Sequence, residues 1–308
     1  MSLINQTLKH MTTADPVVHM NLTMFPLLGG EQSEPGYLTF EEALATNQAR
    51  VTEVSSSGSV PELRFENDCD RPVLLLDGEE LIGAKQNRML NLSILVPARS
   101  SIEIPVSCVE AGRWSSVSSE FSSSGRAQYA KVRARKMDHV SESLRTDGSR
   151  NSRQGEVWND IEEKMDNLDV ESSTRSADDI YRRHTQNIES FVNAIRHVPG
   201  QCGAGFAINH RIIGIDMFDN PMMMSKMLPK LVRSYAMDAI DAPMQGHSSG
   251  NEPLTSFLTD LAEARFERFP AVGLGFDLRL TGRLLWGAAL EADDRIVHLC
   301  ALNHTTRH

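Results

Sequence analysis

The sequence contains no long hydrophobic run. Its apolar residues occur in short stretches between turn signals, and none approaches the roughly 20 residues that span a membrane. The first residues, MSLINQTLKHMTTADP, lack a basic start followed by an apolar block, which is the pattern of a signal peptide. We therefore expect a cytoplasmic protein that does not cross a membrane.

Cysteine is scarce and widely spaced. The sequence has four cysteines and no CxxC pair: Cys69, Cys108, Cys202 and Cys300. This spacing argues against a disulfide framework and against a zinc ribbon. We expect reduced thiols, with Cys108 on the apolar face of its strand, where a thiol packs and does not react.

An excess of positive charge is also missing. Lysine and arginine number 31 against 41 acidic residues, which gives a formal net charge of −10. Non-specific nucleic-acid binding needs a cationic face, so this balance argues against it. A local basic pocket for an anionic small molecule remains compatible with the charge, because clefts focus electrostatic fields.

The sequence is rich in short β patterns at both ends and in helical patterns between them. Alternating apolar residues predict strands over 51–110, 203–218 and 272–302, and helical spacing predicts helices within 126–198 and 226–268. We predict an α+β fold: an antiparallel β-sheet or sandwich formed by N- and C-terminal strands, with a helical middle section. We divide the chain into a loosely structured N-terminal extension (1–38) and a single α+β domain (39–308) with a charged helical segment at 126–198.

Two local signals predict how elements begin and turn. Thr39 and Glu42 have the spacing of a capping box at the start of a short helix. Asp77-Gly78 is typical of a two-residue hairpin turn, which would join strands at 73–76 and 79–82.

A polar cluster lies between two predicted strands. Lys85 and Arg88 could hold phosphate, lysine as a point charge and arginine as a planar fork. Gln86 and Asn87 could hydrogen-bond a sugar or the edge of a base. The alternative is an ordinary solvated turn, since charged loops are common.

A second polar cluster follows the strand that ends at Cys108. Arg113 could bind an anion, and Trp114 could offer a stacking face. The alternative is a structural ion pair between Glu110 and Arg113, with Trp114 covering the core. In a meander, both polar clusters would lie at the same sheet edge.

Carboxylates supply the acid/base candidates. Glu79 and Glu110 are the two that we predict, and Glu79 and Glu80 point to opposite faces of a strand, so they do not form a same-face pair. Nothing in the spacing fixes a metal-ligand geometry. A lone strand histidine such as His298 is more typical of structure than of catalysis.

The two polar clusters also carry a resemblance. Gly83-Ala84-Lys85-Gln86-Asn87-Arg88, followed by Cys108-Val109-Glu110-Ala111-Gly112-Arg113-Trp114, resembles a prokaryotic domain family described as associated with ADP-ribosylglycohydrolases and rhodanese-type phosphatases. Gly273 to Gly287 and Val297-His298-Leu299 fit the same family, so the resemblance covers residues 40–305. It implies NAD or ADP-ribose metabolism by association. It marks the following as motif positions without assigned roles: Lys85, Gln86, Asn87, Arg88, Glu110 and Arg113.

We therefore expect a protein that binds, and can process, an ADP-ribose-, NAD- or nucleotide-like ligand. The predicted contacts are Lys85 and Arg88 to phosphate, Gln86 and Asn87 to sugar or base, Arg113 to an anion, and Trp114 as the stacking surface. The sequence identifies no cofactor. A non-catalytic interaction module that docks a partner enzyme is the alternative, with a metal-dependent hydrolase as the second alternative. Assembly with a second copy of the chain also stays open.

Overall fold

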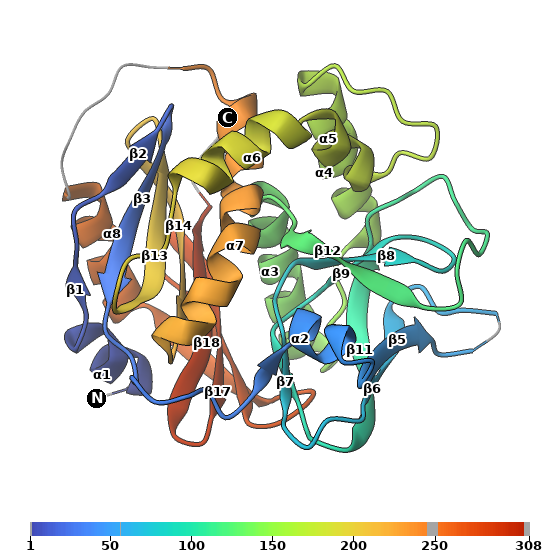
Figure 1. The fold of residues 1–308 in the computed structure, drawn as a ribbon, viewed down its shortest axis with the longest axis horizontal. Helices are drawn as coiled ribbons and strands as arrows, with labels where there is room; N and C mark the ends of the chain where they lie inside the picture. The colour runs from blue at the N-terminus through green and yellow to red at the C-terminus, as the bar shows by residue number, and fades with distance from the viewer. Residues whose placement is uncertain (1, 56, 245–251, 305–308) are drawn as a thin grey trace.

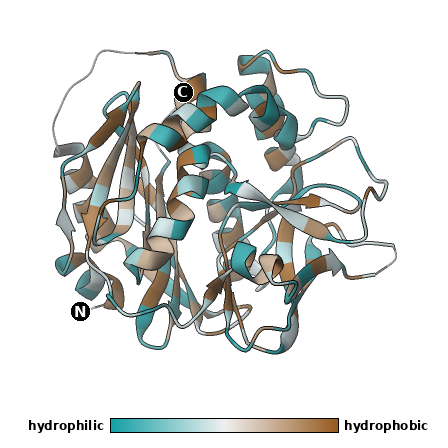
Figure 2. Ribbon diagram, in the orientation of Figure 1, coloured by the Kyte–Doolittle hydropathy of each residue, from teal (hydrophilic) through white to brown (hydrophobic). Residues whose placement is uncertain are grey.

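The predicted α+β fold is confirmed by a computed structural model, which describes residues 2–55, 57–244 and 252–304. A large sheet and a smaller β-barrel stand on either side of a layer of helices (Figure 1). Hydrophobic residues concentrate in the sheet strands, whereas helix α6 (Thr185–Ala194) carries mostly hydrophilic residues on its visible face (Figure 2).

The large antiparallel sheet has nine strands among the described residues. Its order is β1-β3-β13-β14-β18-β17-β16-β15, with β2 paired to β3. The strands are β1 (Thr12–Thr13), β2 (Val17–His19), β3 (Leu22–Leu28), β13 (Gln201–Ile208), β14 (Arg211–Phe218), β15 (Arg265–Pro270), β16 (Phe276–Thr281), β17 (Leu285–Ala292) and β18 (Arg295–Asn303). Every residue of β13 is buried, which fits a central strand covered on both faces.

The smaller β region is a closed barrel with the order β11-β6-β5-β12-β8-β9. Its strands are β5 (Ala49–Glu53), β6 (Glu62–Asn67), β8 (Glu79–Gly83), β9 (Arg88–Leu90), β11 (Ser100–Cys108) and β12 (Phe121–Ala127). A three-stranded sheet shares its hydrophobic core and comprises β4 (Leu38–Thr39), β7 (Val73–Leu75) and β10 (Ile94–Val96). The strands of 51–110 thus close on β12 and form a sheet separate from the C-terminal strands.

Helices cover both faces of the large sheet, and α2 (Phe40–Ala45) packs on the barrel and the small sheet. The helices are α1 (Leu3–Lys9), α2, α3 (Ala130–Thr146), α4 (Gln154–Asn167), α5 (Ala177–Arg183), α6, α7 (Pro221–Asp241) and α8 (Glu252–Glu263). Helix α7 contacts both β13 of the sheet and β12 of the barrel, so it joins the two β regions. Helices α1 and α8 pack on the opposite face of the sheet (Figure 1). No described helix is both long enough and apolar enough to span a bilayer.

The predicted loose structure of residues 1–38 is wrong for most of that segment. Strand β3 pairs with β13 along its whole length, and Leu22, Met24 and Leu27 have no solvent exposure. Apart from a short extended stretch at 17–24, the sequence does not indicate these strands, because Pro26 interrupts the run and the main partner of β3 lies far along the chain.

The predicted hairpin at Asp77-Gly78 is also wrong. Strand β7 pairs with β10 and β4, whereas β8 pairs with β9 and β12, so these two residues carry the chain from the small sheet into the barrel. Gly78 has a φ of +76°, and a Cβ there would lie 2.8 Å from Arg133 Cγ. The glycine therefore serves both the turn and the close approach of α3.

Charged side chains are buried where the sheet, α3 and this connection meet. We call them the junction cluster: Asp77, Arg133, Lys136, Asp216, Asp277, Arg279 and His298. Arg133 Nη2 donates to Asp216 Oδ1 at 2.6 Å, Arg279 Nη2 donates to Asp277 Oδ2 at 2.7 Å, and Lys136 Nζ donates to Asp77. Three acids thus face three cations, and each carboxylate accepts a charged hydrogen bond. His298 Nδ1 lies 2.8 Å from Ser93 Oγ, which agrees with a structural role for this histidine.

Candidate functional site

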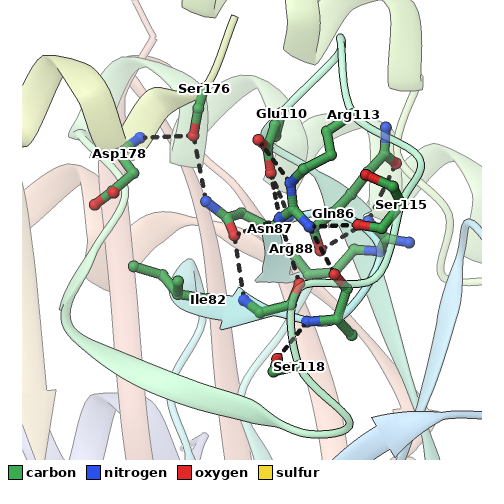
Figure 3. Close-up of polar contacts among 12 residues, drawn as sticks. Ile82, Gln86, Asn87, Arg88, Glu110, Arg113, Ser115, Ser118, Ser176 and Asp178 are labelled. Carbon is green, nitrogen blue, oxygen red and sulfur yellow. Dashed lines mark hydrogen bonds and ion pairs between the residues drawn. The ribbon is translucent and has the colours of Figure 1, made fainter. Parts of the chain in front are cut away.

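Arg113 joins the two polar clusters found in the sequence (Figure 3). Its Nε donates to Glu110 Oε1 at 2.9 Å, and its Nη2 donates to Glu110 Oε2 at 2.6 Å and to Asn87 Oδ1 at 3.2 Å. Its Nη1 donates to the carbonyl oxygens of Ala84 and Ser115 at 2.6 and 3.0 Å. The guanidinium therefore fixes both loops at one end of the barrel and is occupied with internal partners.

Glu110 is held as a carboxylate by the same contacts. Burial raises the pKa of Glu110, but hydrogen bonds from Arg113 and from the Asn87 amide outweigh it, and the net pKa is lower than usual. Both oxygens accept internal hydrogen bonds, the one from the Asn87 amide at 3.0 Å. This geometry favours a positioning role over acid/base chemistry.

The network continues from Asn87 into helix α5. Asn87 Nδ2 donates to Ser176 Oγ at 3.2 Å, and Ser176 Oγ accepts from the Asp178 amide at 3.3 Å as the N-cap of α5 (Figure 3). We call this set the Arg113 network: Asn87, Glu110, Arg113 and Ser176. The sequence analysis missed Ser176, although a serine two residues before an acidic residue at a helix start is a recognisable cap signal.

Beside this network, a buried ion pair is incomplete. Arg88 has no solvent exposure, and its Nη1 donates to the Gln86 carbonyl and side-chain oxygens at 3.1 and 3.2 Å. Its Nε and Nη2 make no hydrogen bond, and Nη2 stands 3.9 Å from Glu53 Oε1. Neither oxygen of Glu53 accepts a hydrogen bond. Buried donors and acceptors of this kind are costly when unpaired. Single atoms of the junction cluster, such as Asp77 Oδ2 and Arg133 Nε, also lack a hydrogen bond, but Glu53 differs in that neither of its carboxylate oxygens has one.

Trp114 and Lys85 lie over this pair. Trp114 is 49% exposed, and its ring centroid lies 5.4 Å from Lys85 Nζ and 5.6 Å from Arg88 Cζ. Lys85 Nζ also donates to the Ser57 carbonyl oxygen at 2.5 Å. We call this site the barrel end: Glu53, Lys85, Gln86, Arg88 and Trp114. It combines an exposed aromatic face with cations and with unpaired polar atoms beneath.

The simpler alternative fails for the first cluster, whereas the ion pair expected for the second cluster is present. Gln86, Asn87 and Arg88 are buried, so the first cluster is not a solvated turn. Glu110 and Arg113 do form an ion pair, but their side chains are only 5% and 12% exposed. Cys108 is buried as predicted, and burial raises the pKa of its thiol to about 11, which keeps it protonated.

Glu79 and Glu80 have separate partners, in agreement with opposite faces of β8. Glu79 Oε1 lies 2.5 Å from Lys230 Nζ, and Glu80 Oε2 lies 2.5 Å from Arg126 Nη2. Burial raises the pKa of each carboxyl to about 7, although the neighbouring cation opposes the shift. Neither partner belongs to the barrel end or to the Arg113 network, and the sequence analysis predicted neither Lys230 nor Arg126.

The described residues contain no group of three or more His, Cys, Asp or Glu side chains arranged to hold a metal ion. The metal-dependent alternative therefore has no ligand set to rest on in that part of the chain.

The motif residues lie at one end of the barrel, and a family model matches the part of the chain that contains them. It matches residues 10–302 and describes the ARG and Rhodanese-Phosphatase-superfamily-associated Protein domain, ARPP-1. The chain belongs to the ARPP-1 family. No curated protein and no solved structure matches the chain. In this ARPP-1 domain, the predicted motif positions divide into the buried Arg113 network and the barrel end, where Lys85 and Trp114 meet solvent.

Proposed function

We propose that the barrel end binds a phosphorylated, nucleotide-like ligand of the ADP-ribose or NAD type. The observation that carries this proposal is the buried Arg88–Glu53 pair, in which Arg88 Nε and Nη2 and both Glu53 oxygens lack hydrogen bonds beneath a half-exposed tryptophan. A ligand hydroxyl between them would accept from one Arg88 donor and donate to one Glu53 oxygen. A ribose carries such hydroxyls.

The other barrel-end residues suit the remaining parts of that ligand. Trp114 supplies a flat face for a base, and Lys85 supplies a positive charge for a phosphate. Asn87 and Arg113 hold the two loops in place and, with their internal partners, position the site without contacting the ligand.

We assign no catalytic step to this site. Both oxygens of Glu110 are occupied, and the partners of Glu79 lie outside the barrel end. Acid/base roles for Glu79 and Glu110 stay predictions, as does the cytoplasmic location. The family description supports a setting near ADP-ribose chemistry by association, since we take ARG to denote ADP-ribosylglycohydrolase.

Titration calorimetry with ADP-ribose, NAD and AMP tests the proposal. We expect heat from at least one of them, and a loss of affinity of about tenfold or more in Lys85→Ala and Trp114→Ala, since a charged contact or a stacked base contributes about 1.5–3 kcal/mol. Lys131→Ala is the matched control, because Lys131 pairs with Glu163 at the surface and lies outside the barrel end. No heat from any ligand, or equal heat in all variants, would remove the proposal.

A docking role for the same face is the second candidate. Trp114 is accompanied by Val117, which is 69% exposed and whose amide is fixed to the Ala84 carbonyl at 3.0 Å. Exposed apolar side chains on a fixed loop are typical of protein contacts. Val117→Ser should lose a stoichiometric partner in a pull-down if the docking role is correct, and it should leave nucleotide binding unchanged, because Val117 does not belong to the barrel end. Trimming 145–178 is a poor test, because Val157 and Ile161 of α4 belong to the core.

A further inference from the structure

A pocket of about 330 Å³ opens between β12 and helices α5, α6 and α7, apart from the barrel-end residues. Three arginines line it, Arg126, Arg182 and Arg233, with Glu189 as the acidic lining residue. Counted over the lining residues alone, three arginines minus one glutamate give +2, and Glu80 and Asp178 beside the lining pair with Arg126. Arginines gathered at a concave surface offer guanidinium donors to small anions.

We call this site the arginine pocket, and Arg126 is its buried arginine. The residue is only 8% exposed, its guanidinium carbon lies 4.4 Å from the ring centroid of Tyr181, and its Nε has no hydrogen-bond partner. Glu80 and Asp178, which are not among the lining residues, hold its Nη2. The side chain is therefore held in place before any ligand binds, and its Nε remains an unpaired donor.

The backbone of β12 contributes to this arrangement. The register of β12 against β8 shifts between Ser123 and Ala127, and Gly125 in this bulge has a φ of +71°. A Cβ on Gly125 would meet no atom within 4 Å, so the glycine serves the backbone conformation and not a packing contact. The bulge re-aims the next side chain, that of Arg126, at the pocket.

The other two arginines come from different helices. Arg233 of α7 donates to Glu189 Oε1 at 2.9 Å and to the Gly125 carbonyl oxygen at 3.2 Å. Arg182 of α5 has a side chain that is 75% exposed, and its Nη1 lies 3.8 Å from Asp178 Oδ2. The Glu189 side chain is 41% exposed, so an incoming anion can replace it on Arg233 at small cost.

We propose that the arginine pocket binds the phosphate group of a small phosphorylated molecule. A phosphate presents acceptor oxygens in several directions and suits guanidinium groups that approach from three separate elements, whereas a carboxylate is filled by a single fork. The site goes beyond the barrel-end proposal and stands on different residues. Asp178 connects the arginine pocket to the Arg113 network, since its carboxylate pairs with Arg126 and its amide donates to Ser176 Oγ.

Calorimetry of the full chain with inorganic phosphate, pyrophosphate and ADP-ribose tests this inference. We expect binding of pyrophosphate that weakens about tenfold in Arg233→Gln and about threefold in the more exposed Arg182→Gln. Arg175→Gln is the control: it removes the same charge from a side chain that is 62% exposed and does not line the pocket. Affinity in the control should equal that of the unaltered chain.

The two proposals fail in different ways. Trp114→Ala and Lys85→Ala should leave pyrophosphate binding unchanged, since neither residue lines the arginine pocket. Absence of pyrophosphate binding, or equal binding in the double variant Arg182→Gln/Arg233→Gln, overturns the arginine-pocket inference. Binding that is lost only in the Trp114 and Lys85 variants also overturns it, while supporting the barrel end.

Discussion

The junction cluster and the barrel end both contain buried charged side chains, but the two differ in how closely these side chains are paired. In the junction cluster, Asp77, Asp216 and Asp277 each accept a hydrogen bond from a cation. At the barrel end, Glu53 accepts none and stands 3.9 Å from Arg88. The first arrangement joins two β regions, whereas the second lies under an exposed tryptophan.

This difference separates charge that holds the fold from charge that is available to a ligand. A closely paired buried ion is strongly destabilising to break, because its partner stays buried and uncompensated. A loosely paired ion contributes little to stability and leaves donors and acceptors for another molecule. Burial alone would have ranked Arg88 and Arg133 together, since neither has any exposure.

The largest effect should follow from breaking a pair in the junction cluster. Lys136→Met leaves Asp77 buried without its hydrogen-bonded cation, so we expect the free energy of unfolding to fall by about 3–5 kcal/mol. Urea denaturation measures it. Adding Asp77→Leu should restore most of the loss, because the orphaned charge is then gone. A fall below about 1 kcal/mol in the single variant would contradict a structural role for the cluster.

Glu80 is an intermediate case, because it is ion-paired but strongly desolvated. Its contribution to the free energy of unfolding should depend on pH. Its folded pKa of about 7 exceeds the ordinary 4.5, so the folded chain binds more protons between these values. The free energy of unfolding therefore falls as pH rises from about 4.5 to 7. Glu80→Gln should shrink this fall by about 2–3 kcal/mol, measured by urea denaturation at pH 5 and 7.5. Glu62→Gln, at an exposed position, should leave the pH dependence intact.

Arg113 extends the comparison to a fully engaged guanidinium beside the barrel end. Arg113→Lys keeps the charge but cannot serve Glu110, Asn87 and the Ala84 carbonyl together, so we expect a loss of about 2 kcal/mol. Thermal unfolding measures it. Arg64→Lys, at a surface pair with Glu103, should lose much less stability. Equal losses in both variants would argue against the Arg113 network.

The smallest effect on stability should come from the barrel end itself. Replacing the loose pair by Arg88→Met with Glu53→Leu should change the free energy of unfolding by less than about 1 kcal/mol, or increase it. The same double variant should lose ADP-ribose binding in calorimetry. A large destabilisation would place this pair with the junction cluster and remove the distinction between the two regions.

The sequence predicted the fold where local patterns coincide with local structure. The capping box of Thr39 and Glu42 is present, and the apolar stripe of α7, including Leu228, Leu231 and Tyr235, is buried. Strand β12 was missed, because its FSSSGRA sequence offers few apolar side chains. Barrel closure, which pairs β12 with β8 and β5, supplies the hydrogen bonds that define it.

The candidate site was predicted only in part for a similar reason. The ion pair between Glu110 and Arg113, which the sequence offered as the alternative to anion binding, is present. Glu53 and Ser176 are distant from Arg88 and Asn87 along the chain, and only barrel closure and the docking of α5 bring them together. Three of the four polar residues in the Lys85–Arg88 cluster are buried, so burial excludes the solvated turn, and the predicted ligand contacts stay a proposal.

The order in which the strands leave the ribosome has a consequence for β3. All barrel strands lie within residues 49–127, so their pairings are available once that stretch has emerged. Strand β3 emerges before the barrel, yet its central partner β13 begins only at Gln201. During synthesis β3 can pair with β1 and β2, but its apolar side chains, Leu22 and Leu27 among them, must wait for β13 while most of the chain is made. A nascent chain stalled after the barrel would therefore carry three strands of the large sheet, β1 to β3, without the rest of that sheet, as an apolar segment that chaperones can bind.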